Sequence, residues 1–174
     1  MQERTDTMCK RVWLSALLLV LLAIRPAAAG PAQAGIAAYN AHDYPTAARL
    51  LLPLAQHGDP QAQTYVAFMF QNGRGLPQNN TAAAHWYRAA SEQGVPVAQF
   101  MLGLMYDKGH GVPQDYVLAY KWLNIATARA TPREREYWVR IRDAVSNKLT
   151  LVQRTAGQDL ASDWFYVRRP PEIH

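Results

Sequence analysis

The sequence has almost no cysteine, because Cys9 is the only one among 174 residues. It lies near the N-terminus, ahead of a hydrophobic run, so a chain from which this segment is removed contains none. Disulfide bonds, thiolate metal sites and a cysteine nucleophile are then excluded. We expect the stability of such a chain to come from side-chain packing alone.

The sequence also lacks the short motifs that mark common catalytic sites. It contains no His-Glu-x-x-His, Ser-x-x-Lys, Gly-x-Ser-x-Gly or P-loop pattern. The histidines at 42, 57, 85 and 110 are scattered over the chain and do not share the spacing of metal ligands. We therefore predict no catalytic residue, no cofactor and no metal site.

Charge of one sign is not in large excess. The chain has 18 basic and 13 acidic residues, a formal net charge of +5, and residues 30–174 alone carry 14 basic and 11 acidic residues, a net charge of +3. This small excess argues against a dedicated nucleic-acid-binding protein. With 49% hydrophobic residues the composition is that of a globular protein.

Residues 1–29 have the order of segments found in a secretory signal peptide. Lys10 and Arg11 precede an apolar run from Val12 to Ile24, and small residues follow up to Ala29. The run is shorter than the roughly 20 residues that span a bilayer core, which leaves a retained anchor as the less favoured alternative. We expect cleavage after Ala29 and an exported, periplasmic protein. Translation could start at Met1 or at Met8.

The middle of the chain repeats itself at a fixed interval. A shift of 36 positions aligns residues 61–96 with residues 97–132. Self-similarity at a period of roughly 20–50 residues is typical of solenoid proteins. A degenerate copy precedes these two, so we divide residues 30–130 into repeats at about 33–60, 61–96 and 97–130. Identical pairs include Ala62 and Ala98, Met69 and Met105, Gly73 and Gly109, Gly75 and Gly111, Pro77 and Pro113, and Trp86 and Trp122.

Each repeat is predicted to contain two helices joined by a turn. In the last repeat, Leu102 and Met105 recur at helical spacing in an apolar stripe. Gly109 is suited to the left-handed conformation that ends a helix. Asp115, like Asn79 one repeat earlier, is placed to cap the second helix with its side chain.

Residues 131–165 are predicted to form two capping helices, at about 132–147 and 150–164. Thr131 with Glu134, and Thr150 with Gln153, have the spacing of a capping box. A terminal repeat would otherwise expose its apolar side, so this pair should close the end of the solenoid. Residues 166–174 are predicted to be a flexible tail.

The two clear repeats resemble the Sel1-like repeat, a relative of the tetratricopeptide repeat. The resemblance covers about residues 33–130 and depends most on the Gly-x-Gly-[Val/Leu]-Pro-Gln step that occurs twice at one period. It implies an all-α fold, a right-handed α-solenoid of helix-turn-helix repeats. The last repeat carries the pattern at Ala98, Leu102, Gly103, Tyr106, Gly109, Gly111, Val112, Asp115, Ala119, Trp122 and Ala126.

The resemblance implies a scaffold or adaptor that binds a partner protein or peptide and is not an enzyme. Fold alone does not choose the partner. The alternative is a module of the cell wall that binds glycan or peptidoglycan, or an enzyme accessory, since the tyrosines and tryptophans could stack on sugars.

A candidate binding surface lies on the first helices of the two clear repeats. On a helical wheel, one set of side chains faces away from Ala62 and its apolar stripe, and the next copy continues the set. We predict that a peptide or partner helix binds there. The alternative is that these side chains pack between adjacent repeats, and Tyr65 is expected nearer the core. The six predicted residues are Thr64, Phe68, Gln71, Phe100, Leu104 and Asp107.

Basic residues outnumber acidic ones across the capping helices. Salt-bridged, solvated helix faces account for most of such an excess. Contact with an acidic partner or an anionic membrane is the alternative. The basic residues are Arg129, Arg133, Arg135, Arg140, Arg142, Lys148 and Arg154.

Overall fold

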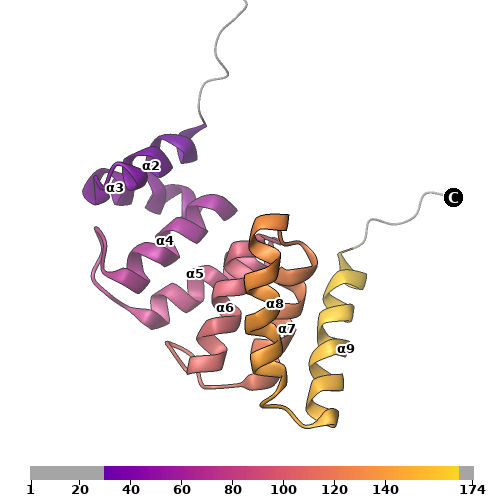
Figure 1. Ribbon diagram of the computed structural model, residues 1–174. Helices are drawn as coiled ribbons and strands as arrows, with labels where there is room; N and C mark the ends of the chain where they lie inside the picture. The colour runs from indigo at the N-terminus through magenta and orange to yellow at the C-terminus, as the bar shows by residue number, and fades with distance from the viewer. Residues whose placement is uncertain (1–29, 169–174) are drawn as a thin grey trace, which may run out of the picture. The chain divides into compact units, whose positions relative to one another are not determined.

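The computed structural model describes residues 30–168, and these form eight α-helices with no strand among them (Figure 1). The predicted signal peptide and residues 169–174 of the predicted tail lie outside the described residues. The helices are α2 (Pro31–Asn40), α3 (Tyr44–Gln56), α4 (Pro60–Asn72), α5 (Asn80–Glu92), α6 (Pro96–Lys108), α7 (Tyr116–Ala128), α8 (Pro132–Ser146) and α9 (Leu151–Val167).

The helices stack in pairs that follow the sequence repeats. Helices α2 and α3, α4 and α5, and α6 and α7 pack against each other within a pair, and α3 with α4 and α5 with α6 join successive pairs. In Figure 1 the colours therefore run in chain order from one end of the stack to the other. The prediction of an all-α solenoid is confirmed.

Local sequence explains where the repeat helices begin and end. Pro60 and Pro96 open α4 and α6, where the missing N–H of proline has no helical partner to lose. Gly73 closes α4 with a φ of 66°, and Gly109 closes α6 with a φ of 69°. The Asn79 side chain accepts from the backbone N–H of residue 82 and so caps α5, and Asp115 caps α7 in the same way. These predicted ends and caps are confirmed.

The second glycine of each loop has a packing role. A Cβ atom at Gly111 would overlap the backbone oxygen of Asn80, at the start of α5 in the preceding pair. A Cβ atom at Gly75 would overlap the backbone oxygen of Tyr44 at the start of α3. The loops thus lie directly on the preceding pair, and only a residue without a side chain fits there.

The core is built from small residues around a few large ones. Ala83 and Ala119 are fully buried, as are Tyr87 and Leu123. The alanines allow close approach of the helices, and the larger side chains fill the space beside them. Two buried clusters result, a small one around α3 and α4 and a larger one that extends from α4 to α9.

Helices α8 and α9 follow the repeats and both pack on α7. The Thr131 backbone N–H donates to the Glu134 carboxylate at 3.2 Å, and the Thr150 backbone N–H donates to Gln153 Oε1 at 2.9 Å. These contacts confirm the predicted helix starts. The predicted start of the tail at residue 166 is wrong by two residues, because α9 continues to Val167, with Trp164 buried in its last turns.

Candidate functional site

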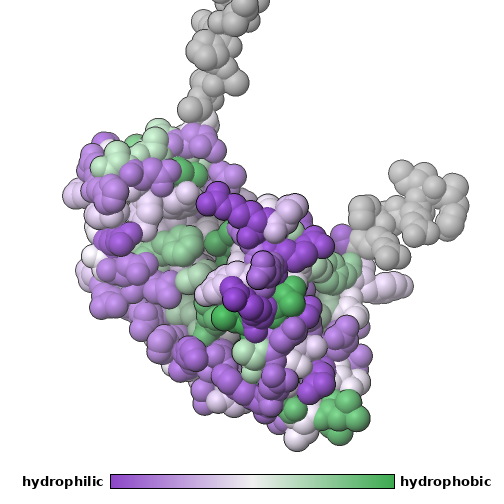
Figure 2. Space-filling model, in the orientation of Figure 1, coloured by the Kyte–Doolittle hydropathy of each residue, from purple (hydrophilic) through white to green (hydrophobic). Residues whose placement is uncertain are grey.

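A shallow groove lies where α2, α4 and the start of α6 meet, and we call it the α4 groove. It has a volume of about 340 Å³. In Figure 2 the surface over α4 is coloured green, so it is more hydrophobic than the purple surface around it. The residues that line the groove are Gln33, Ile36, Gln61, Thr64, Tyr65, Phe68, Val95 and Val97.

Phe68 forms the aromatic centre of this groove. Its ring packs edge-on against Tyr65 at 6.3 Å and against the buried Tyr87 at 5.5 Å, measured between centroids. The ring stays half-buried, so one side is held by the core and the other faces the groove. Such a fixed aromatic side chain is a suitable anchor for an apolar group of a partner.

Thr64 and Gln71 flank Phe68 on α4 and are tied to the fold. The Thr64 hydroxyl donates to the Pro60 carbonyl oxygen at 2.8 Å, and the side chain is buried. Gln71 Oε1 accepts from the Tyr87 hydroxyl at 2.7 Å. Burial raises the pKa of Tyr87, so the phenol stays protonated and remains a donor. Both polar side chains therefore help to hold the groove wall in place.

The counterparts on α6 lie under the capping helices. Phe100 is 5% exposed and stacks on Trp138 of α8, with 4.7 Å between ring centroids. Leu104 is half-buried against the larger core cluster. We expected one surface to continue from α4 to α6, and this is wrong at Phe100 because α8 covers the ring that a partner was expected to contact.

Asp107 is the most deeply buried charged residue on α6, at 4% exposed. Its carboxylate accepts from Lys148 Nζ at 2.5 Å and lies 3.1 Å from Lys108 Nζ. Burial raises the pKa of Asp107, but the hydrogen bonds and charges of these two lysines outweigh it and lower the pKa overall. The carboxylate thus fixes the turn after α8 to α6, a structural contact in place of the expected partner contact.

Three apolar groove residues, Ile36, Val95 and Val97, were not predicted from the sequence, and neither were the polar Gln33 and Gln61. Val95 occupies the N-cap position of α6 and makes no capping hydrogen bond, whereas Asp59 caps α4 at the equivalent position. Valine is a poor N-cap residue. That local mismatch is the signal in the sequence that position 95 serves another purpose. Tyr65 was assigned to the core edge, and it also lines the groove.

The described residues contain neither a cluster of metal ligands nor a helix that could span a membrane. Among residues 30–168, no three His, Cys, Asp or Glu side chains gather in a group that could hold a metal ion. Over the same range no helix combines the length and hydrophobicity needed to cross a bilayer.

The fold and groove define a class, the α-solenoids built from short helix pairs. The family profile described as Sel1 repeat matches residues 60–95 and 96–130, which are the pairs α4–α5 and α6–α7. The chain belongs to the Sel1 repeat family. Proteins with this fold commonly mediate protein–protein interaction and are generally non-catalytic scaffolds.

Two solved structures show the likeness in three dimensions. One is a protective antigen present in uropathogenic Escherichia coli strains that displays an SLR fold, similar over 83% of this chain with a TM-score of 0.73 and 26% identity. This chain spans 31% of the length of that antigen. The other is a Sel1 repeat protein from Oxalobacter formigenes, 39% identical with a TM-score of 0.50, covering 53% of this chain and 70% of its own. No curated protein matches the chain.

Proposed function

We propose that this chain is an exported, periplasmic adaptor without catalytic activity, which binds a partner protein or peptide through the α4 groove. Membership of the Sel1 repeat family supports a protein partner. The order of basic, apolar and small residues in positions 1–29 supports export.

The half-buried ring of Phe68 is the observation that carries the proposal for the groove. Ile36 on α2 and Val97 on α6 lie on either side of it. The side chains of Gln33 and Gln61 meet at the rim, 3.4 Å apart. An apolar centre with a polar rim is the usual composition of a protein interface. The groove therefore suits one apolar side chain of a partner, with backbone or polar groups at its edge.

A crosslinking pull-down from the envelope fraction tests the proposal. The double variant Ile36→Glu and Val97→Glu places a carboxylate on each side of the groove, and we expect capture of the specific partner to fall by about tenfold or more. Circular dichroism would verify that the variant remains helical. Phe68 is left unchanged because its ring packs on the buried Tyr87. Ile36 and Val97 are half-buried against the core clusters, so urea unfolding would verify that the variant also keeps its stability.

The matched control is the double variant Ala37→Glu and Val152→Glu. Both side chains are exposed, neither lines the groove, and the added charge is the same. We expect this control to capture the partner as the unchanged protein does. An equal loss of capture in both double variants would refute the proposal that the partner binds in the α4 groove. Capture of cell-wall fragments without any protein would favour the glycan-binding alternative.

Export is tested separately. Mass spectrometry of the protein from a periplasmic fraction should find an N-terminus at Gly30, because the small residues up to Ala29 form the predicted cleavage site. A protein that keeps residues 1–29 and stays with the membrane would show the retained anchor instead.

A further inference from the structure

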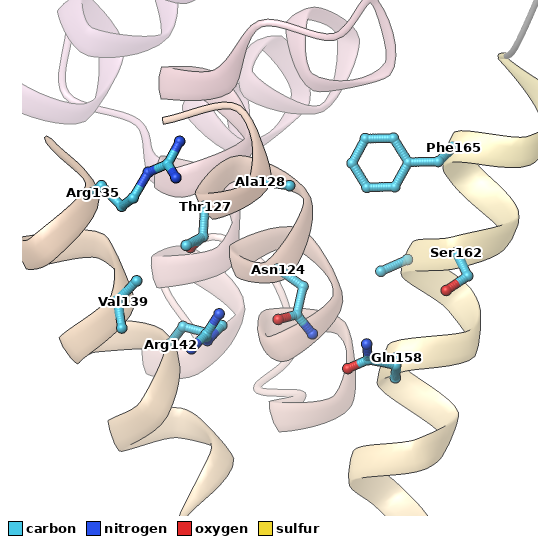
Figure 3. A pocket seen from close by; sticks show the side chains of 10 residues that line it. Asn124, Thr127, Ala128, Arg135, Val139, Arg142, Gln158, Ser162 and Phe165 are labelled. Carbon is cyan, nitrogen blue, oxygen red and sulfur yellow. The ribbon is translucent and has the colours of Figure 1, made fainter. Parts of the chain in front are cut away.

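Helices α8 and α9 leave a second groove between them, with α7 as its floor. Figure 3 shows Asn124, Thr127 and Ala128 of α7 in the middle, Arg135, Val139 and Arg142 of α8 on one side, and Gln158, Ser162 and Phe165 of α9 on the other. We call this the α8–α9 groove. Its volume is about 400 Å³, within the range of roughly 300–1,000 Å³ found for binding pockets.

A second hollow adjoins this groove at Phe165, which lines both and is 39% exposed. The Arg168 guanidinium lies 4.5 Å from the centroid of the Trp164 ring. Arg129 lies against Gly94, where a Cβ atom would come within 2.7 Å of its Nη1. Two further guanidinium groups thus continue the surface past the exposed phenylalanine.

The linings of the groove and the hollow contain four arginines and no acidic residue. Arg142 is paired with Asp143 at 2.7 Å. Within residues 30–168, Arg129, Arg135 and Arg168 form no ion pair. These three arginines are therefore not neutralised by salt bridges, whereas salt-bridged helix faces were the main expectation for the basic residues of the capping helices.

Two hydrogen-bond donors without acceptors lie beneath this surface. Asn124 Nδ2, on the floor of the α8–α9 groove, and Nε1 of Trp164, which is 8% exposed, are buried and have no acceptor within the described residues. Buried donors without acceptors destabilise a fold. Both atoms lie beneath the surface, so the arginines supply its exposed donors and positive charge, and an occupant rich in oxygen acceptors would complement them.

We propose that the α8–α9 groove binds an acidic peptide segment of a partner protein. Carboxylates of the segment meet Arg129, Arg135 and Arg168, and an apolar side chain between them packs on Phe165. A peptide can enter a recess between two helices, whereas a bilayer surface reaches only the rims. This site is separate from the α4 groove and does not depend on it.

The test uses the full chain and a short fluorescein-labelled peptide of alternating Glu and Leu. We expect binding to the unchanged protein that weakens as salt is added. The double variant Arg129→Gln and Arg135→Gln should bind about tenfold or more weakly, because it removes two guanidinium groups that hydrogen-bond the carboxylates of the peptide. A peptide with Gln in place of every Glu should not bind.

The matched control is the double variant Arg133→Gln and Arg140→Gln, which removes the same charge from exposed positions of α8 outside the groove. We expect it to change binding by less than about twofold, the effect of general screening. An equal loss in both doubles would mean that only net charge matters and would overturn the proposal. So would the absence of binding to the unchanged protein.

A second pair of variants leaves the arginines intact. Ser162→Glu places a carboxylate in the groove wall and should block the peptide, whereas Thr155→Glu, on the same helix outside the groove, should not. Both positions are exposed, so the fold should tolerate them. If a chain shortened after Arg168 binds the peptide much more tightly, the chain's own end is the occupant and the proposal fails. Stronger, arginine-dependent binding to phosphatidylserine vesicles than to the peptide would also overturn it.

Discussion

The ring of Phe100 on α6 lies nearly parallel to the indole of Trp138 on α8, with an angle of 11° and 4.7 Å between the centroids. The two residues belong to different parts of the sequence, the last repeat and the capping region. Their stack covers the surface of α6 and leaves α4 as the part of the predicted surface that is open. The capping helices thus decide which part of the predicted surface is open.

Trp138→Ala should destabilise the protein by about 3–5 kcal/mol, because it removes a large buried side chain and uncovers Phe100. Urea unfolding followed by circular dichroism measures this loss. Tyr137→Ala is the control, since Tyr137 is 50% exposed although its ring lies 5.9 Å from that of Phe100. A loss no greater for Trp138→Ala than for this control would show that the stack contributes little.

Lys148→Met should lower the free energy of unfolding by about 1 kcal/mol near neutral pH, since Lys148 is partly exposed and part of its interaction is screened. The pKa of Asp107 is lowered in the folded protein. The pairing therefore stabilises the fold fully above the unfolded carboxyl pKa of about 3.9 and ceases to do so as the pH falls through the lower folded pKa.

The stability difference between Lys148→Met and the unchanged protein should accordingly shrink toward zero in acid. Urea unfolding at several pH values measures it. Lys108→Met is the comparison, because Lys108 is 59% exposed and lies farther from the carboxylate. A difference that stays constant with pH would mean that the effect of Lys148 does not depend on the charge of Asp107.

Gly111→Ala should destabilise the protein by more than the roughly 1 kcal/mol that a left-handed alanine costs. Its Cβ would also overlap the backbone at Asn80 and force the loop away from α5. Gly58→Ala isolates the backbone effect, because Gly58 has a φ of 93° but open space around it. Thermal unfolding of the two variants should show the larger decrease in melting temperature for Gly111→Ala; equal decreases would remove the packing argument.

Tyr87→Phe should cost about 0.5–1.5 kcal/mol by removing the hydrogen bond to Gln71 while keeping the buried ring. Tyr106→Phe is the comparison, because the Tyr106 hydroxyl accepts from Arg88, an exposed side chain that water can satisfy. Chemical unfolding should rank the Tyr87 variant as the less stable of the two. If the Tyr106 variant were the less stable one, burial of the hydrogen bond between Tyr87 and Gln71 would add nothing to stability.

The sequence by itself determined the helices and their ends. Proline at the start, glycine in the left-handed region and the side-chain caps of Asn79 and Asp115 act within a few residues of the chain, so their pattern can be read without the fold. The 36-residue period determined that the helices stack as repeats.

Only the tertiary structure decided which surface is open. A helical wheel gives the direction of Phe68 or Phe100 around its own helix axis, but it does not say which distant segment lies in that direction. Trp138 covers Phe100 and Lys148 pairs with Asp107 from far along the chain, whereas Phe68 faces the α4 groove. The arginine-lined groove likewise exists because α8 and α9 both pack on α7, an arrangement that depends on contacts between three helices.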